Sequence, residues 1–262
     1  MTFKFKIVLK NFYFYAETIS KSTNKILIMK LLLISNSTNA GEEYLAYPMP
    51  YIKEFLGNKS LKCVFLPYAA VTFSYDEYED KVQERFKEIG HDVKSIHHFS
   101  NPIDAIENAD AIVVGGGNTF QLISMIHENK LVDAVRKKVL NGTPFIGWSA
   151  GSNVACPTIK TTNDMPIAEP SSFNAFNFVK FQINPHYLDA NPLGHAGETR
   201  EQRIEEFLEI NPDIYVAGLR EGCMFKIVNN SIQHIGKRTM RLFIKGSEPK
   251  EFSSEDNLDF LL

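Results

Sequence analysis

From Lys30 onward, short apolar runs alternate with stretches that have helical spacing of apolar residues. The runs KLLLIS, LKCVFLPYA, DVKSIHHF, ADAIVVGG and TPFIGWS are typical of strands. Between them, SYDEYEDKVQERFKEIG and LVDAVRKKVLNG place apolar residues on one helical face and end at a glycine. Strands that alternate with helices pair in parallel through helical crossovers. The order therefore predicts a parallel sheet with helices on both faces.

The C-terminal third departs from this alternation. VKFQINPH, DIYVAGL, CMFKIV, SIQHIG and RLFIK are short strand candidates, and TREQRIEEFLEI is one clear helix among them. No linker rich in Pro, Gly or Ser divides the chain after residue 30, so we expect residues 29–262 to form a single domain. Residues 1–28 precede the first predicted strand, and we expect them to be an extension outside this domain.

Composition and charge restrict the possible partners and the compartment. A net charge of −3 leaves no excess of cations to neutralise phosphates or to attract an anionic membrane. Nucleic acid is therefore not an expected partner. No apolar run reaches the roughly 18 residues that a membrane span requires, so we do not expect a membrane as a partner either. The cysteines Cys63, Cys156 and Cys223 are too few and too scattered for a disulfide framework. We therefore expect a cytoplasmic protein.

Ser149 lies in the centre of GWSAG, at the point where the predicted strand TPFIG turns into a helix. The pattern G-x-S-x-G is typical of a nucleophile elbow, in which small neighbours permit a tight turn that exposes the serine. Such a pattern is also a common helix entry with serine as the cap, but the preceding strand favours the nucleophile. The helix start after the serine, beginning with the amide of Ala150, can stabilise a developing oxyanion.

Three glycines follow the strand AIVV, in Gly115-Gly116-Gly117-Asn118. Their spacing fits neither a dinucleotide fingerprint nor a phosphate-binding P-loop. A plain turn between strand and helix would account for them. Beside a serine elbow, however, the amide of Gly117 is a natural second oxyanion donor together with that of Ala150.

A serine nucleophile requires a general base, and His186 is the candidate. It follows the strand VKFQIN at a proline-stiffened strand end, on the edge of the sheet where loops carry chemistry. A structural histidine would also fit this position. The histidines and cysteines lack metal-ligand spacing, so we expect neither a metal nor an organic cofactor.

Three motifs resemble the peptidase E family of aspartyl dipeptidases: GWSAGSNVACPTIKTTNDMP, FQINPHYLDANPLGHAGETREQR and VVGGGNTFQL. These serine peptidases are related to cyanophycinases and share the fold of class I glutamine amidotransferases. The resemblance runs from about Met29 to Lys250. It implies an α/β three-layer sandwich with a mostly parallel central sheet, flavodoxin-like winding and short extra strands in the C-terminal third. It also implies Ser149 as nucleophile and His186 as base.

The resemblance leaves two candidates for the acidic member, Asp164 in TTNDMP and Glu221 in LREG. Glu221 follows the predicted strand DIYVAGL, so its side chain could reach His186 from a strand end. Asp164 lies in a turn-rich segment, where aspartate is common as a turn residue. We expect Glu221 to orient His186, and Asp164 to hold a loop or to bind the α-amino group of the substrate.

Arg200 is the candidate for substrate recognition. Thr199 and Gln202 form a capping-box pattern that places Arg200 first in a helix, where a cation opposes the helix dipole. A solvent-facing arginine paired with a nearby glutamate fits equally well. The resemblance implies that this arginine, in GETREQR, receives the carboxylate of an N-terminal aspartate. Arg203 and Arg220 are the next candidates.

The sequence thus predicts hydrolysis of Asp-X dipeptides through an acyl-enzyme on Ser149. The alternatives are a cyanophycinase-like enzyme, an esterase-type hydrolase with a later histidine such as His234, and a non-catalytic binding protein on the same fold. The sequence leaves open the oligomeric state and the residue preferred after aspartate.

Overall fold

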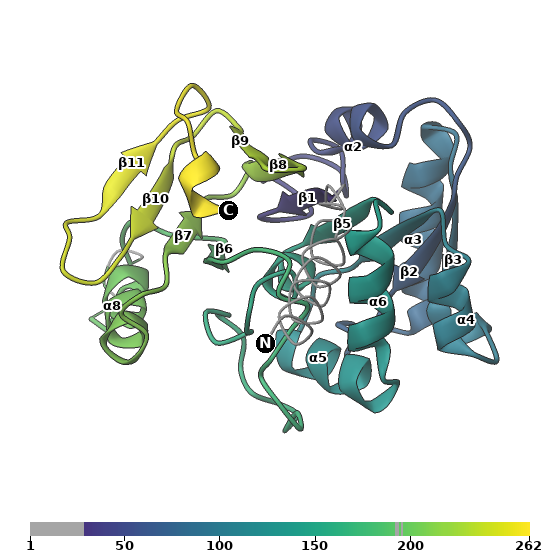
Figure 1. Cartoon of the computed structure of the whole chain (residues 1–262), viewed down its shortest axis with the longest axis horizontal. Coiled ribbons are helices and arrows are strands. Elements are labelled where there is room, and N and C mark those ends of the chain that lie inside the picture. Colours follow the sequence, from purple (N-terminus) through teal and green to yellow (C-terminus); the bar gives the residue numbers. More distant parts are fainter. Residues whose placement is uncertain (1–28, 192–193, 195) are drawn as a thin grey trace, which may run out of the picture.

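The strands of the computed structural model form two sheets (Figure 1), and the model describes residues 29–191, 194 and 196–262. The predicted extension, residues 1–28, lies outside the described residues. The larger sheet has the order β3-β2-β4-β5-β1-β8-β9. Its strands are β1 (Lys30–Ile34), β2 (Lys62–Leu66), β3 (Asp92–Ser95), β4 (Ala111–Val114), β5 (Phe145–Trp148), β8 (Met224–Val228) and β9 (Ser231–Ile235).

The first five strands of this sheet pair in parallel, and β8 and β9 extend it in the antiparallel sense. The mostly parallel central sheet is therefore confirmed. Its order differs from the flavodoxin-like winding, in which the first strand lies between the second and third. Here β1 lies between β5 and β8, because β8 pairs with the edge of β1 that β5 leaves free.

Alternate residues of each strand face opposite helical layers. Leu31 and Leu33 belong to one buried cluster with residues of α4 (Pro102–Glu107), α5 (Thr119–Glu128) and α6 (Leu131–Leu140). Leu32 and Ile34 belong to another with α2 (Met49–Leu56) and α3 (Tyr75–Glu88). Strands that are buried on both faces must be apolar throughout, which explains the continuous apolar runs. The three-layer sandwich is confirmed.

One predicted strand is shorter than its apolar run. The run DVKSIHHF leaves the sheet after Ser95 and continues as a single 3₁₀ turn, η1 (Ile96–His98). The strand β3 forms the edge of this sheet, and on its open side the side chain of Glu79 in α3 accepts the backbone N–H of Ser95, the last residue of the strand, at 2.7 Å.

The other short strands of the C-terminal third build the second sheet, in the order β11-β10-β7-β6. Its members are β6 (Gln182–Pro185), β7 (Val216–Leu219), β10 (Met240–Phe243) and β11 (Lys250–Phe252), and α8 (Arg200–Ile210) packs against it through Ile204 and Leu208. The strands β6 and β7 are parallel, with Pro185 opposite Leu219. The residues that follow these two strands, His186 and Arg220, therefore emerge side by side.

Ser35, directly after β1, joins the two sheets. Its backbone N–H donates to the carbonyl of Cys223 at 3.0 Å, and its hydroxyl donates to the carbonyl of Leu219 at 2.8 Å. The ends of β1, β5, β6 and β7 consequently meet in one region. Within the described residues, no helix has both the length and the apolar character that crossing a membrane requires.

His234, on β9, should make the fold sensitive to acid. Its side chain is 1% exposed, and neither ring nitrogen has a hydrogen-bond partner among the described residues. Burial lowers its pKa from 6.5 to about 4. The unfolded chain therefore binds a proton below about pH 6.5 that the folded chain does not bind until about pH 4. As the pH falls through this window, the protonation of this residue alone should lower the free energy of unfolding by about 2 to 3 kcal/mol.

Urea unfolding of the wild type and of His234→Leu at pH 7 and pH 4.5 measures this contribution. The variant should lose less stability between the two pH values than the wild type does. Equal losses in the two proteins would show that His234 does not contribute to the acid sensitivity.

Candidate active site

Ser149 occupies a sharp turn between β5 and the short helix α7 (Ala150–Asn153). Its φ is 53°, in the left-handed region that residues with a side chain rarely adopt. The flanking glycines are required by space. A Cβ on Gly147 would lie 2.3 Å from the carbonyl oxygen of Gly151, and a Cβ on Gly151 would lie 2.2 Å from that of Val114. The G-x-S-x-G pattern therefore corresponds to a tight elbow that points the serine away from the sheet.

His186 lies between Ser149 and Glu221. Its Nε2 is 3.0 Å from the Ser149 Oγ, and its Nδ1 is 2.7 Å from the Glu221 Oε1. An ionised carboxylate can only accept, so Nδ1 carries the proton and donates to Glu221. Nε2 is then free to accept the hydroxyl proton of Ser149. This serine, histidine and carboxylate chain is the arrangement used for nucleophilic acyl transfer.

Two polar residues after β1 hold the histidine and the glutamate in place. The Ser35 hydroxyl accepts the backbone N–H of His186 at 3.0 Å. The Asn36 Oδ1 accepts the backbone N–H of Gly222, directly after Glu221, at 2.8 Å. We did not single out either residue from the sequence. The available signal was their position, since polar residues that follow a buried parallel strand lie at the edge where loops carry chemistry.

Asp164 lies against the start of α5. Its Oδ2 accepts the backbone N–H of Thr119 at 2.7 Å and the hydroxyl of Thr162 at 3.1 Å. Its neighbour Asn163 donates a side-chain hydrogen bond to the carbonyl of Pro185 at 2.7 Å, directly before His186. No hydrogen bond joins Asp164 to His186 in the described part of the chain. The geometry thus favours Glu221 over Asp164 as the partner of the histidine.

Backbone amides surround Ser149 in a cavity of about 510 Å³ that Gly116, Gly117 and His186 also line. Neither glycine amide donates a hydrogen bond to another described residue. Ala150 is the first residue of α7, so its amide has no acceptor within the helix. A Cβ on Gly116 would lie 3.1 Å from the Ser149 Cβ, so this member of the three-glycine motif, to which we assigned no role from the sequence, lies directly against the serine.

The comparison with protein families decides the identity. The model of peptidase family S51 matches residues 31–235. The chain belongs to peptidase family S51. The resemblance inferred from the motifs is confirmed, and the chain is a peptidase.

Relatives and solved structures agree with this assignment. Peptidase E of a Nostoc species is 59% identical to this S51 peptidase over 233 residues, which cover 89% of this chain and 96% of the relative. Peptidase E of Salmonella typhimurium is 46% identical over 220 residues, or 84% of this chain and 96% of the relative. The crystal structure of a peptidase from an acI-B1 actinobacterium has the same fold, with a TM-score of 0.64 at 16% identity over 88% of this chain and 96% of that chain.

Arg200 begins α8 of the S51 peptidase, and the predicted capping box of Thr199 and Gln202 is present. Its side chain is half-buried, and its guanidinium makes no ion pair with any described carboxylate. Burial is the main cause that lowers its pKa, the nearby charge of Arg203 lowers it further, and the carboxylate of Asp164 opposes this effect. A half-buried cation without an ion-pair partner is suited to receive an anionic ligand.

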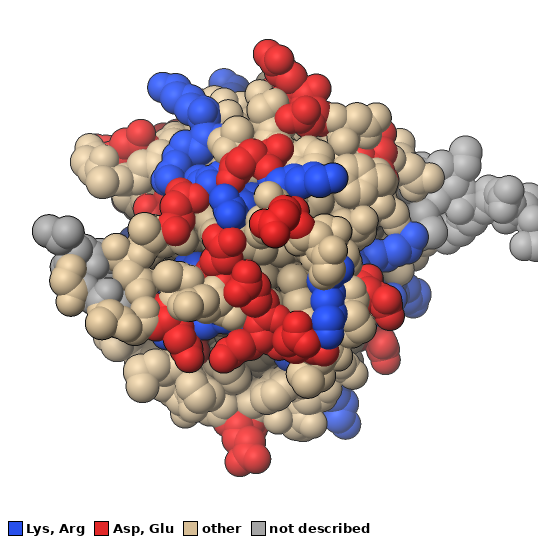
Figure 2. Space-filling view, turned by 90° about the vertical axis from the view of Figure 1, so that its left-hand side faces the viewer, with Lys and Arg blue, Asp and Glu red and all other residues tan. Residues whose placement is uncertain are grey.

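The other two candidate cations are already paired. Arg220 is buried and binds the carboxylates of both Asp189 and Glu251, which holds its pKa above the ordinary value. Arg203 is exposed and lies 3.6 Å from Glu198. Figure 2 shows acidic and basic side chains close together on the face formed by the second sheet and α8. Of these three arginines, Arg200 is therefore the best candidate for a substrate carboxylate, although it does not belong to the described residues that line the cavity around Ser149.

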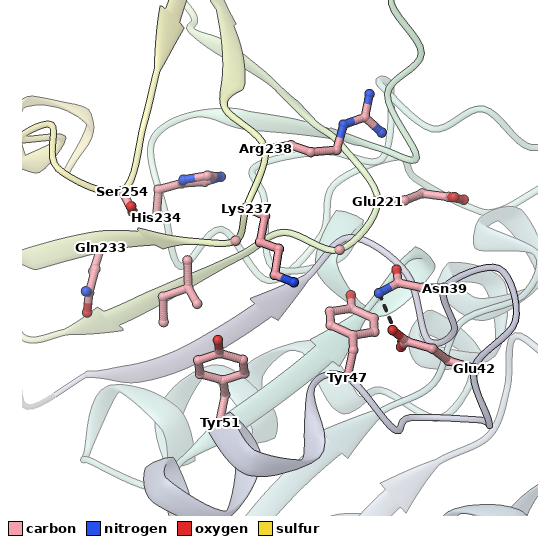
Figure 3. Close-up of a pocket in the computed structure, with 13 residues that line it drawn as sticks. Asn39, Glu42, Tyr47, Tyr51, Glu221, Gln233, His234, Lys237, Arg238 and Ser254 are labelled. Carbon is pink, nitrogen blue, oxygen red and sulfur yellow. Dashed lines mark hydrogen bonds between the residues drawn. The ribbon is translucent and has the colours of Figure 1, made fainter.

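Glu221 also borders a second cavity, of about 670 Å³ (Figure 3). Tyr47, Lys237 and Arg238 line it, but neither Ser149 nor His186 does. His234 lines this second cavity too, and neither of its ring nitrogens forms a hydrogen bond with Ser149 or with any other described residue. Its position gives no support to an esterase-type triad that uses His234.

Proposed function

We propose that this S51 peptidase is a serine-type dipeptidase that hydrolyses Asp-X dipeptides. The hydrogen-bonded chain of Ser149, His186 and Glu221 at the nucleophile elbow is the observation that carries the proposal. Arg200 supports the preference for aspartate, because it offers a half-buried cation.

In the proposed reaction, the Ser149 Oγ attacks the carbonyl carbon of the N-terminal residue while the His186 Nε2 takes the hydroxyl proton. The amides of Ala150 and Gly117, with Gly116 beside them, stabilise the oxyanion. His186 then gives its proton to the leaving amine, and an acyl-enzyme remains. Water, activated by the same histidine, attacks the acyl carbonyl and releases the first residue and the free serine. Glu221 keeps the imidazole in the reactive tautomer and stabilises its charged form.

A panel of peptides assayed with the purified protein tests the function. It comprises Asp-X, Glu-X, Asn-X and Ala-X dipeptides together with longer peptides that begin with aspartate. The dipeptides that begin with aspartate should have the highest kcat/KM. Equal rates for Ala-X would contradict the aspartate preference, and the absence of any peptide hydrolysis would favour a binding protein on the same fold.

Replacing Arg200 with leucine should selectively weaken the turnover of Asp-X. If Arg200 pairs with the aspartyl carboxylate, its loss leaves that charge unpaired in a partly desolvated site and costs about 2–5 kcal/mol of transition-state stabilisation. Asn-X has no side-chain charge and should lose much less. The quantity to measure is therefore the ratio of kcat/KM for Asp-X to that for Asn-X.

Arg203→Leu is the matched control, because Arg203 lies on the same helix but is exposed and pairs with Glu198. It should leave the ratio close to that of the wild type. If the ratio of kcat/KM for Asp-X to that for Asn-X were unchanged in Arg200→Leu, Arg200 would only face solvent. Another cation would then bind the aspartyl carboxylate.

A further inference from the structure

Two carboxylates and two imidazoles meet at the outer edge of the large sheet, where α3 lies beside β3 (Figure 1). Asp76 and Glu79 lie one turn apart near the start of α3, and His97 and His98 form the end of η1. Each residue offers one ligand atom, and these four atoms all lie within 4.8 Å of one another. We propose that these side chains bind a divalent transition-metal ion, with Zn²⁺ as the best fit.

The distances leave little to rearrange. The His98 Nε2 is 2.7 Å from the Glu79 Oε2 and 3.1 Å from the Asp76 Oδ1, and the His97 Nε2 is 2.9 Å from the same Asp76 oxygen. Ligands of a tetrahedral zinc ion, each about 2.0–2.2 Å from the metal, are about 3.3–3.6 Å apart. To hold the ion, these three separations must widen by roughly half an ångström, while the widest separations among the four atoms, which lie within 4.8 Å, must shorten to the same range. The side chains of Asp76 and His98 are 69% and 41% exposed, so they are free to make this shift.

The other two ligands are held in place by Ser95. Its backbone N–H binds the Glu79 Oε1 at 2.7 Å, which leaves Oε2 facing the cluster. Its hydroxyl lies 2.6 Å from the His97 Nδ1. When Nδ1 carries the proton and donates to this hydroxyl, the His97 Nε2 presents its lone pair to a metal. Ser95 is fully buried, so it is a fixed support of the kind that orients ligating side chains in metal sites.

The donor set selects the class of ion. Mg²⁺ and Ca²⁺ prefer oxygen ligands alone, whereas two imidazoles with two carboxylates suit Zn²⁺ and its neighbours among the divalent transition metals. None of the four residues lines the cavity around Ser149. The connection to that cavity runs through Tyr78 of α3, whose hydroxyl donates to the carbonyl of Gly116 at 2.9 Å. A metal that joins α3 to η1 would therefore hold one wall of the active site.

The sequence spacing did not indicate this site. Asp76 lies close to Glu79 in the sequence and His97 adjoins His98, but Asp76 and His97 are 21 positions apart, and Glu79 and His98 are 19 apart. The pairing of β2 with β3 and the packing of α3 beside β3 bring the two pairs together.

Zinc binding by the untagged full-length chain tests the proposal. All proteins carry His186→Ala, which removes the histidine that faces Glu221 in the described part of the chain, and are treated with a chelator before calorimetric titration with Zn²⁺. We expect one Zn²⁺ per chain, with an affinity reduced at least about tenfold by His97→Ala/His98→Ala. Co²⁺ should give the visible absorption of a tetrahedral site, and the double substitution should abolish it. Saturating Zn²⁺ should also raise the Tm by about 5 °C in the parent protein but not in the double variant.

Two further variants separate the loss of a metal ligand from a loss of folding and from the loss of any histidine. In Glu79→Gln the amide oxygen can still accept the Ser95 N–H, while the charged ligand is lost, so zinc should bind more weakly in a folded protein. His127→Ala removes a histidine of α5 that binds the carbonyl of Asn174, and zinc binding should be unchanged. Zinc affinity equal in the double variant and the parent would overturn the proposal. So would a parent protein that binds no Zn²⁺, since the four side chains would then serve only as hydrogen-bonded pairs.

Discussion

Ser149→Ala should lower kcat by about 10⁶-fold while leaving the Tm nearly unchanged. The hydroxyl is the proposed nucleophile, so its removal abolishes the acyl-enzyme route. The Ser149 Oγ forms its hydrogen bond with the His186 Nε2, and the imidazole is partly exposed, so water can replace this contact in the variant. Steady-state kinetics on an Asp-X dipeptide and a thermal melt of the same sample measure the two quantities.

Ser124→Ala is the control. Ser124 is buried on α5, and its hydroxyl has no hydrogen-bond partner among the described residues, so alanine should be tolerated there with activity retained. An activity of Ser149→Ala within tenfold of the wild type would refute the serine mechanism.

Glu221→Gln should lower kcat by about 10²–10⁴-fold, and by more than Asp164→Asn does. A glutamine amide can donate to the His186 Nδ1, which favours the tautomer with the proton on Nε2. In that tautomer Nε2 cannot accept the proton of Ser149. The Glu221 side chain is 46% exposed, so water can partly replace the carboxylate as the acceptor of the His186 Nδ1 proton. We therefore expect a loss of at least about 10²-fold in kcat. The measurement is kcat at saturating Asp-X.

Asp164→Asn should act mainly on the loop that Asp164 holds. The amide oxygen can still accept from Thr119 and Thr162, but without the negative charge these hydrogen bonds weaken, so the start of α5 should loosen and the Tm should fall. Glu42→Gln is a control for charge near Glu221, since Glu42 lines the second cavity and not the one around Ser149. If Asp164→Asn caused the larger fall in kcat with an unchanged KM, the roles of the two acids would have to be exchanged.

The features that depend on neighbours along the chain were predictable from the sequence. Continuous apolar runs indicated strands buried on both faces, and Leu31 and Leu32 do face opposite helical layers. The elbow was predictable for the same reason. The close approach of Gly147 to Gly151, which excludes a Cβ, is a contact within five residues of the chain, so the motif itself reports the turn.

The partner of His186 was decided only by the tertiary structure. Asp164 and Glu221 lie 22 and 35 positions from the histidine, and both fitted the sequence. The parallel pairing of β6 with β7 places Pro185 opposite Leu219, and this register brings Glu221 to the Nδ1 of His186. The contact of Gly116 with Ser149 joins the ends of β4 and β5, and the cluster of Asp76, Glu79, His97 and His98 joins α3 to η1. Local periodicity determines which segments become strands and helices. The order and register in which those strands pair determine which side chains meet, because pairing depends on residues far apart in the chain.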